Sequence, residues 1–221
     1  MKLRIVIAGV LLSLITACTT NPYTGEREAS NKAKGAGIGA AVGAVVGALT
    51  GDDADERRKR ALIGAGVGAL TGTAVGSYMD AQEARLREQL RGSGVSVTRV
   101  GDDVILNMPG NITFDVDRSD LRDNFSPVLD SVSLVLKEYD QTLIDVTGHT
   151  DSTGAISHNM QLSQRRAGSV ATYLKATGID SMRVYTQGVG PHYPVADNSS
   201  AAGRQLNRRV ELVLKPVAST G

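Results

Sequence analysis

The chain lacks several features that would assign it to common functional classes. Its 221 residues include a single cysteine, which excludes an intramolecular disulfide. Tryptophan is absent and aromatic residues are scarce. Lysine and arginine total 24 and aspartate and glutamate total 23, so the charge gives no indication of a nucleic-acid partner. Glycine is abundant, but 11 of the 25 glycines lie between residues 35 and 76, so averages over the whole chain are misleading.

The N-terminus has the pattern of an export signal. Lys2 and Arg4 precede a short apolar run from Ile5 to Ile15, and small residues follow it. The run is too short to cross a bilayer as a structural helix. We therefore expect residues 1–17 to form a signal peptide.

The only cysteine lies where that signal would end. The run Leu14-Ile15-Thr16-Ala17-Cys18 resembles a bacterial lipobox, in which the cysteine is acylated and becomes the mature N-terminus. An unpaired thiol within a signal sequence is the alternative interpretation. Acyl chains contribute about 0.8 kcal/mol per buried CH₂, so lipidated Cys18 would be anchored firmly in membrane lipid. Thr19 in place of aspartate implies, by resemblance to bacterial lipoproteins, sorting to the outer membrane.

Two glycine repeats follow a polar tether at residues 18–34. Residues 35–51 and 64–76 each carry glycine at every fourth position, and the charged segment 52–60 separates them. Glycine costs a helix in water about 1 kcal/mol relative to alanine, whereas small side chains let paired helices approach closely. We expect residues 35–79 to form a glycine-zipper helical hairpin with a charged loop. A flexible low-complexity linker is the alternative.

The position of this hairpin relative to the membrane is left open by the sequence. Each apolar run is about 17–19 residues long, near the lower limit for a transmembrane helix. The hairpin can therefore span the bilayer, lie at its surface, or pack against other copies as a homo-oligomer. Residues 80–94 are expected to form a polar linker helix that ends near Gly92.

The hydrophobic pattern of residues 95–221 predicts a separate α+β domain. Alternating apolar positions around residues 95–108 indicate a strand hairpin, and residues 126–139 and 157–177 each have one apolar helical face. Further extended segments are expected at residues 143–146, 184–189 and 209–214. About 115 residues with this pattern are enough for one hydrophobic core.

A charged motif joins one predicted strand to the following helix. Asp151 lies in the loop Gly148-His149-Thr150-Asp151-Ser152-Thr153-Gly154, and Asn159-x-x-Leu162-Ser163-x-x-Arg166 follows. At about 100° per residue, Arg166 lies on the flank of the apolar helical face, whereas Arg165 points away from it. A half-buried guanidinium needs an anion. Asp151 and Arg166 can bind a small zwitterion, or they can form an ion pair that only stabilises the fold.

Together with Asn207-Arg208-Arg209-Val210-Glu211, these motifs resemble the OmpA C-terminal-like family, which includes the Pal lipoproteins. The resemblance covers roughly residues 104–217. It implies an OmpA-like βαβαβ sandwich domain that follows a glycine-rich helical hairpin and binds the diaminopimelate residue of peptidoglycan. It implies structural roles for Asn207 and Arg208, with a contact to glycan left open. The residues that it implies for ligand binding are Asp151, Arg166, Phe114, Asp115, Thr150, Leu162 and Ser163.

Enzymatic and metal-binding functions are not indicated. His149, Asp151 and His158 match no closed zinc-site spacing, and no cofactor motif is present. There is no Gly-x-Ser-x-Gly motif and no free cysteine nucleophile after lipidation. Taken with the family resemblance, the sequence predicts a lipid-anchored, periplasm-facing outer-membrane protein, and the resemblance implies that it tethers the membrane to diaminopimelate-type peptidoglycan. The alternative is a membrane-embedded structural or assembly protein that oligomerises through the hairpin.

Overall fold

The computed structural model describes residues 52–218 except 65 and 67. The expected signal peptide, the lipidated Cys18, the tether and the first glycine repeat lie outside these residues. In the described part of the chain, no helix is both long enough and apolar enough to cross a membrane.

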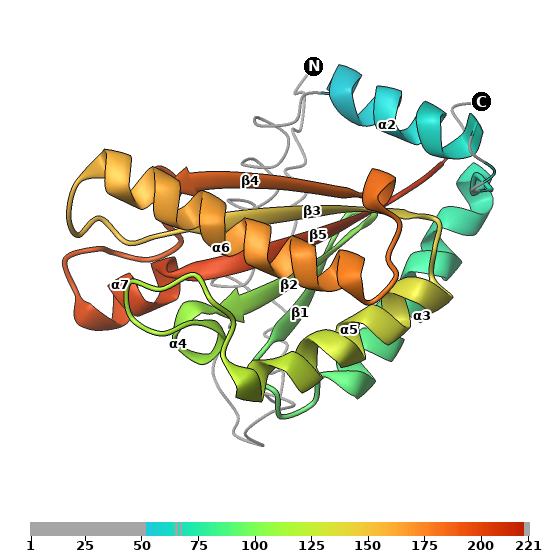
Figure 1. Cartoon of the computed structure of the whole chain (residues 1–221). Coiled ribbons are helices and arrows are strands. Elements are labelled where there is room, and N and C mark those ends of the chain that lie inside the picture. The colour runs from blue at the N-terminus through green and yellow to red at the C-terminus, as the bar shows by residue number, and fades with distance from the viewer. Residues whose placement is uncertain (1–51, 65, 67, 219–221) are drawn as a thin grey trace, which may run out of the picture.

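A five-stranded sheet with the strand order β1-β2-β5-β3-β4 forms the centre of the domain (Figure 1). Strands β3 and β4 are parallel, and the other neighbouring pairs are antiparallel. The expected α+β class is confirmed. The strands are β1 (Ser96–Val100), β2 (Asp103–Pro109), β3 (Thr142–His149), β4 (Val184–Gly190) and β5 (Arg209–Pro216).

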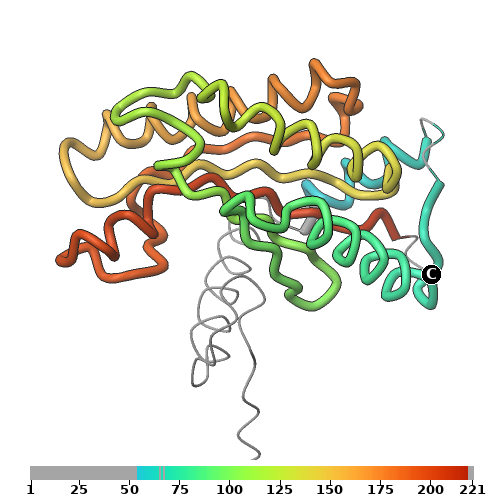
Figure 2. Tube along the Cα trace, turned by 90° about the horizontal axis from the view of Figure 1, so that it is seen from below, coloured from blue at the N-terminus to red at the C-terminus, as the bar shows by residue number. Residues whose placement is uncertain are grey.

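Helices α5 (Ser126–Glu138) and α6 (Ile156–Ala176) lie together on one side of the sheet, as Figure 2 shows. Ile144 and Val146 on β3 face these helices and belong to the main hydrophobic core. The short helices α4 (Gly110–Thr113) and α7 (Ala201–Asn207) lie near the ends of β2 and β5. These elements surround the C-terminal end of β3, where the Asp151 loop begins.

The second glycine repeat does not form the expected zipper helix. Helix α2 (Asp52–Gly64) ends at the first glycine of this repeat, and Gly66 has a positive φ of 96°. The backbone N–H of Leu70 then donates a 2.8 Å hydrogen bond to the carbonyl of Val217, beyond β5. Leu70 therefore pairs with the chain just after β5, and the second glycine repeat does not form one continuous helix.

Helix α3 (Gly72–Gln89) joins the end of that repeat to the predicted linker helix. Met79 and Leu86 are fully buried in the main core. The Tyr78 hydroxyl accepts a 2.9 Å hydrogen bond from the backbone N–H of Gln141. Helix α3 is therefore continuous through residue 80, where the expected hairpin would meet the linker helix, and it packs against the domain.

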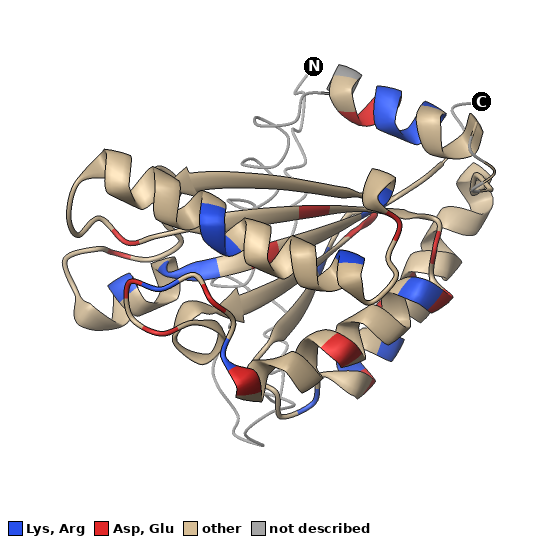
Figure 3. Ribbon diagram, viewed as in Figure 1, with Lys and Arg blue, Asp and Glu red and all other residues tan. Residues whose placement is uncertain are grey.

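The charged segment expected to be a loop is part of helix α2 (Asp52–Gly64). Acidic and basic residues both lie along this helix (Figure 3), and the Arg58–Asp55 pair at 3.0 Å has helical i,i+3 spacing. Leu62 is buried with Leu143 of β3, which points away from the α5–α6 side because side chains alternate along a strand. Helix α2 therefore covers part of the opposite face of the sheet.

Candidate functional site

Two glycines let α6 approach the parallel strands closely. A Cβ atom added at Gly148 of β3 would lie 2.1 Å from the carbonyl oxygen of Ser163. One added at Gly188 of β4 would lie 2.2 Å from the backbone nitrogen of Gln164. Since real side chains do not tolerate such contacts, the glycines bring α6 next to the loop that carries Asp151.

The loop after β3 holds the carboxylate of Asp151 in a fixed position. Its Oδ1 atom accepts a 2.8 Å hydrogen bond from the backbone N–H of Thr153. Asn159, near the start of α6, donates a 2.8 Å hydrogen bond from Nδ2 to the carbonyl of Thr153. One carboxylate oxygen is therefore used to shape the loop, and Oδ2 is left for a charged partner.

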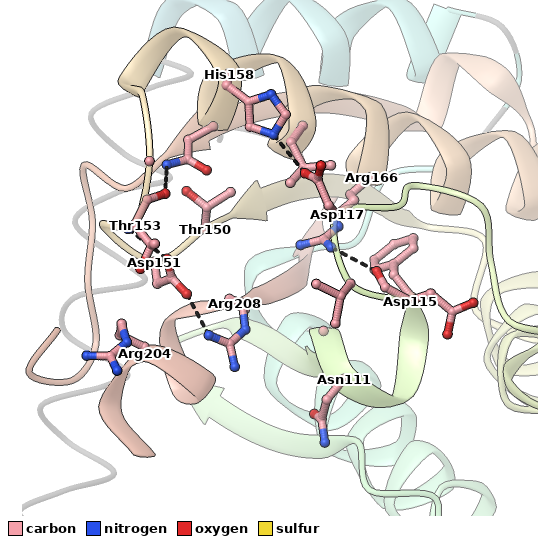
Figure 4. Close-up of a pocket in the computed structure, with 16 residues that line it drawn as sticks. Asn111, Asp115, Asp117, Thr150, Asp151, Thr153, His158, Arg166, Arg204 and Arg208 are labelled. Atoms are coloured by element: carbon pink, nitrogen blue, oxygen red, sulfur yellow. Dashed lines mark hydrogen bonds and ion pairs between the residues drawn. The ribbon is translucent and has the colours of Figure 1, made fainter. Parts of the chain in front are cut away.

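That partner within the protein is Arg208, whose Nη1 lies 2.5 Å from Oδ2 of Asp151 (Figure 4). Burial by itself would raise the pKa of Asp151, but the hydrogen bonds from Arg208 and Thr153 outweigh it and lower the pKa. The carboxyl group is consequently ionised at neutral pH. The sequence indicated a mainly structural role for Arg208, whereas its guanidinium group lies in the candidate site.

Arg166 has no ion pair with a carboxylate among the described residues. Its side chain is buried, and Nε donates a 2.8 Å hydrogen bond to the carbonyl of Arg118. Nη2 donates a longer one, 3.4 Å, to the carbonyl of Asp115, and the guanidinium carbon lies 5.1 Å from the centre of the Phe114 ring. Burial lowers the pKa of Arg166, and the nearby carboxylate of Asp117 opposes this effect. The Asp151–Arg166 ion pair considered as an alternative does not form in the described structure.

These side chains line one cavity of about 550 Å³. Six of the seven residues implied for ligand binding contribute to its wall, namely Asp151, Arg166, Phe114, Asp115, Thr150 and Leu162. The hydroxyl of Thr150 is buried and has no hydrogen-bond partner among the described residues. The cavity wall also includes residues that were not predicted as binding residues, among them Asn111, Asp117, His158, Asn159, Arg204 and Arg208.

The prediction that Ser163 binds a ligand is not supported. The side chain is fully buried, and its hydroxyl donates a 2.8 Å hydrogen bond to the carbonyl of Met160. The same hydroxyl accepts a 2.9 Å hydrogen bond from the backbone N–H of Gly190. Because Ser163 faces β4 and Leu162 faces the cavity, Ser163 joins α6 to the sheet.

His158 and Asp117 form the outer edge of the cavity. Their Nε2 and Oδ1 atoms are 2.7 Å apart, and both side chains are exposed. Asp117 has a φ of 57°, which is uncommon for a residue other than glycine. This contact connects the loop before α5 to α6, and the sequence gave no sign of it because the two residues come from distant segments.

A buried polar network supports the strand ends beneath the site. Arg209 Nε lies 2.6 Å from Glu211 Oε1, and His149 Nε2 lies 3.5 Å from Oε2. Arg209 also donates hydrogen bonds of 3.2 Å to the carbonyls of Asn207 and Tyr193. Burial lowers the pKa of His149, which keeps its ring neutral at pH 7, although the carboxylate of Glu211 opposes this.

Asn207 has the structural position that the sequence indicated. Its side chain is fully buried, and Oδ1 accepts hydrogen bonds of 2.8 and 3.0 Å from the backbone N–H groups of Val195 and Ala196. Asn207 thereby shapes the loop before α7 and fixes the start of β5. In the part of the chain described here, no cluster of three or more His, Cys, Asp or Glu side chains is suited to a metal ion.

The fold and the site define an OmpA-type domain. The model of the OmpA family matches residues 113–208, and the model of the YMGG-like Gly-zipper matches residues 1–80. The chain is 52% identical to "Probable lipoprotein YiaD" of Escherichia coli K12, over 98% of this chain and 100% of that protein. It therefore belongs to the OmpA family, among outer-membrane lipoproteins whose domain faces the periplasm.

Two other similar proteins match a smaller part of the chain. "Peptidoglycan-binding protein ArfA" of Mycobacterium bovis is 37% identical over 105 residues, which cover 48% of this chain and 32% of that protein. The structure of the cell wall anchor of the T6SS from Pseudomonas aeruginosa has a TM-score of 0.55 and 33% identity. It covers 60% of this chain and 97% of that one.

Proposed function

We propose that this protein binds the diaminopimelate residue of a peptidoglycan stem peptide and thereby tethers the outer membrane to the cell wall without a covalent bond. The observation that carries the proposal is the presence in one cavity of Asp151 and Arg166, which do not neutralise each other. The free end of diaminopimelate has an ammonium and a carboxylate group on one carbon. These two charges are complementary to the two side chains.

The contacts of Asp151 and Arg166 suit them to different halves of that ligand. Asp151 is ionised, and its Oδ2 atom is in contact with the positively charged side chain of Arg208. The ammonium group of the ligand can bind at the same oxygen. Arg166 is held by the carbonyls of Arg118 and Asp115, so little side-chain entropy remains to be lost when it binds the ligand carboxylate. The remaining wall can contact the methylene chain through Leu162.

Relatives support the cell-wall part of the proposal. One similar protein is named as peptidoglycan-binding, and one similar structure is described as a cell wall anchor. The predicted lipid at Cys18 would hold the other end of the chain in the outer membrane. The described part of the second glycine repeat pairs with the domain itself, which gives no support to the alternative of an oligomerising membrane hairpin.

A co-sedimentation experiment with isolated cell walls tests this function. The purified protein should sediment with diaminopimelate-type walls and much less with lysine-type walls. Asp151→Ala should remove most of the binding, whereas Asp120→Ala, at an exposed position outside the cavity, should not. Equal sedimentation with both wall types, or equal loss in both variants, would mean that the protein does not recognise diaminopimelate through Asp151.

A further inference from the structure

The geometry points to Arg208 as a residue that sets ligand specificity by exchanging partners. We infer that Arg208 occupies the cation position on Asp151 and is displaced by the ligand ammonium, after which it joins Arg166 in binding the neighbouring ligand carboxylate. This inference rests on the proposed function and adds a residue and a selection rule to it.

The contacts of Arg208 fit such an exchange. Its backbone is fixed, because its N–H donates to the carbonyl of Arg204 at 3.1 Å and its carbonyl accepts from the N–H of Gly110 at 2.8 Å. Its side chain, by contrast, is 39% exposed. The contact with Asp151 is its only side-chain hydrogen bond among the described residues. Since a guanidinium has five N–H donors, most of them are available to a ligand.

The two buried arginines near the site, Arg166 and Arg209, cannot exchange in this way. Arg166 is buried and bonded to two backbone carbonyls. Arg209 is also buried, and it is bonded to Glu211 and to two backbone carbonyls. Of these three arginines, Arg208 is the one whose guanidinium can change partner without leaving a buried group unsatisfied.

Charge explains why this exchange would select a ligand that has an ammonium and a carboxylate group on the same carbon. Thr153 already uses Oδ1 of Asp151, so a ligand ammonium and Arg208 compete for Oδ2. A lone amine displaces Arg208 and offers it no new partner. Diaminopimelate has a carboxylate on the same carbon as its ammonium group. Charges then alternate across the site, from Asp151 to the ligand ammonium, and from the ligand carboxylate to Arg208. A carboxamide at the same position has no charge to offer Arg208.

Calorimetry with the full-length lipoprotein in detergent tests this selection rule. The probes are three soluble stem tripeptides that end in diaminopimelate, in the amide of its free carboxyl group, or in lysine. The wild-type protein should prefer the first. Arg208→Gln should bind the first about three- to tenfold more weakly and the other two more tightly, so that the preference falls by about tenfold or more. Arg208→Lys, which retains a cation, should keep most of the preference.

Arg165→Gln is the matched control, because it removes a positive charge from an exposed position on α6, outside the cavity. This variant should change the preference by less than about twofold. If Arg208→Gln weakens all three peptides equally, Arg208 has only a structural role and the inference is wrong. If the wild-type protein binds none of the peptides, the proposed function fails as well.

Discussion

Arg58 of helix α2 lies 2.7 Å from Asp145, a fully buried carboxylate in the middle of β3. Lys215 of β5 lies 3.1 Å from the same carboxylate. The segment between the two glycine repeats is therefore attached to the face of the sheet that α5 and α6 leave uncovered. The compact unit extends beyond the segment matched by the OmpA family model, because α2 and α3 are packed onto it.

This ion-pair cluster predicts how substitutions on α2 and β3 affect stability. Asp145→Ala should lower the free energy of unfolding by about 3 kcal/mol, because it removes the fully buried carboxylate and leaves Asp55 as the remaining counter-charge for both Arg58 and Lys215. Arg58→Ala should cost less, since Lys215 still pairs with Asp145. Arg57→Ala, at an exposed position, should stay within about 0.5 kcal/mol of the wild type. Urea unfolding of the purified variants measures these values, and similar losses for Arg57→Ala and Asp145→Ala would contradict docking of α2.

Asp103 gives a pH-dependent prediction. Burial raises the pKa of this carboxyl group to about 6, although Lys215 opposes the effect. The folded state then holds a proton that the unfolded state releases near pH 4, so this contribution to stability is lost as the pH rises through about 6. Asp103→Asn should therefore be more stable than the wild type by about 2 kcal/mol at pH 8, with almost no difference at pH 3.5.

The control for Asp103 is its neighbour Asp102, whose side chain is 70% exposed. Asp102→Asn should show no comparable gain at pH 8. Unfolding curves of both variants and the wild type at the two pH values make the comparison. If Asp103→Asn gains the same stability at pH 3.5 and at pH 8, the gain does not come from removing a buried charge at Asp103.

The close approach of α6 to β3 predicts opposite effects at two glycines. Gly148→Ala should destabilise the protein by more than about 2 kcal/mol, because its Cβ would collide with the backbone of Ser163. Gly168→Ala, within α6, meets nothing within 4 Å and should stabilise the helix by up to about 1 kcal/mol. Thermal melting distinguishes the two variants, and a tolerated Gly148→Ala would show that α6 does not need to lie this close.

The network below the site predicts the effect of removing one buried charge. Glu211→Gln retains the shape of the side chain but leaves the charge of buried Arg209 unbalanced, so stability should fall by about 3 kcal/mol. Glu88→Gln, which is 64% exposed, serves as the control and should cost less than about 1 kcal/mol. A wild-type melting temperature for Glu211→Gln would show that the network is not required.

The sequence predicted the parts of the site that depend on local periodicity. The flank position of Arg166 follows from the 3.6-residue repeat of one helix, and the position of Asp151 follows from the strand and loop that carry it. The pairing of Arg208 with Asp151 depends on how β5 and the β3 loop meet in three dimensions. No local pattern encodes that contact, so Arg208 was assigned a structural role.

The interpretation of α2 failed for a related reason. A run of charged residues is usually solvated, so residues 52–60 were expected to form an exposed loop. Their opposite charges lie on the sheet, at Asp145 and Lys215, far away in the sequence. An aspartate within the apolar strand from Leu143 to Val146 was the available signal, because a buried carboxylate needs a cation from another element.

The most direct test of the central claim compares two adjacent arginines on one helix. The claim is that Arg166 binds the carboxylate of diaminopimelate, whereas Arg165 is exposed and lies outside the cavity. Calorimetry should show that Arg166→Ala weakens binding of the diaminopimelate tripeptide by about tenfold or more, with a wild-type melting temperature as evidence of folding. Arg165→Ala should change the affinity by less than about twofold. Equal losses in the two variants would show that diffuse positive charge, and not a specific site, attracts the peptide.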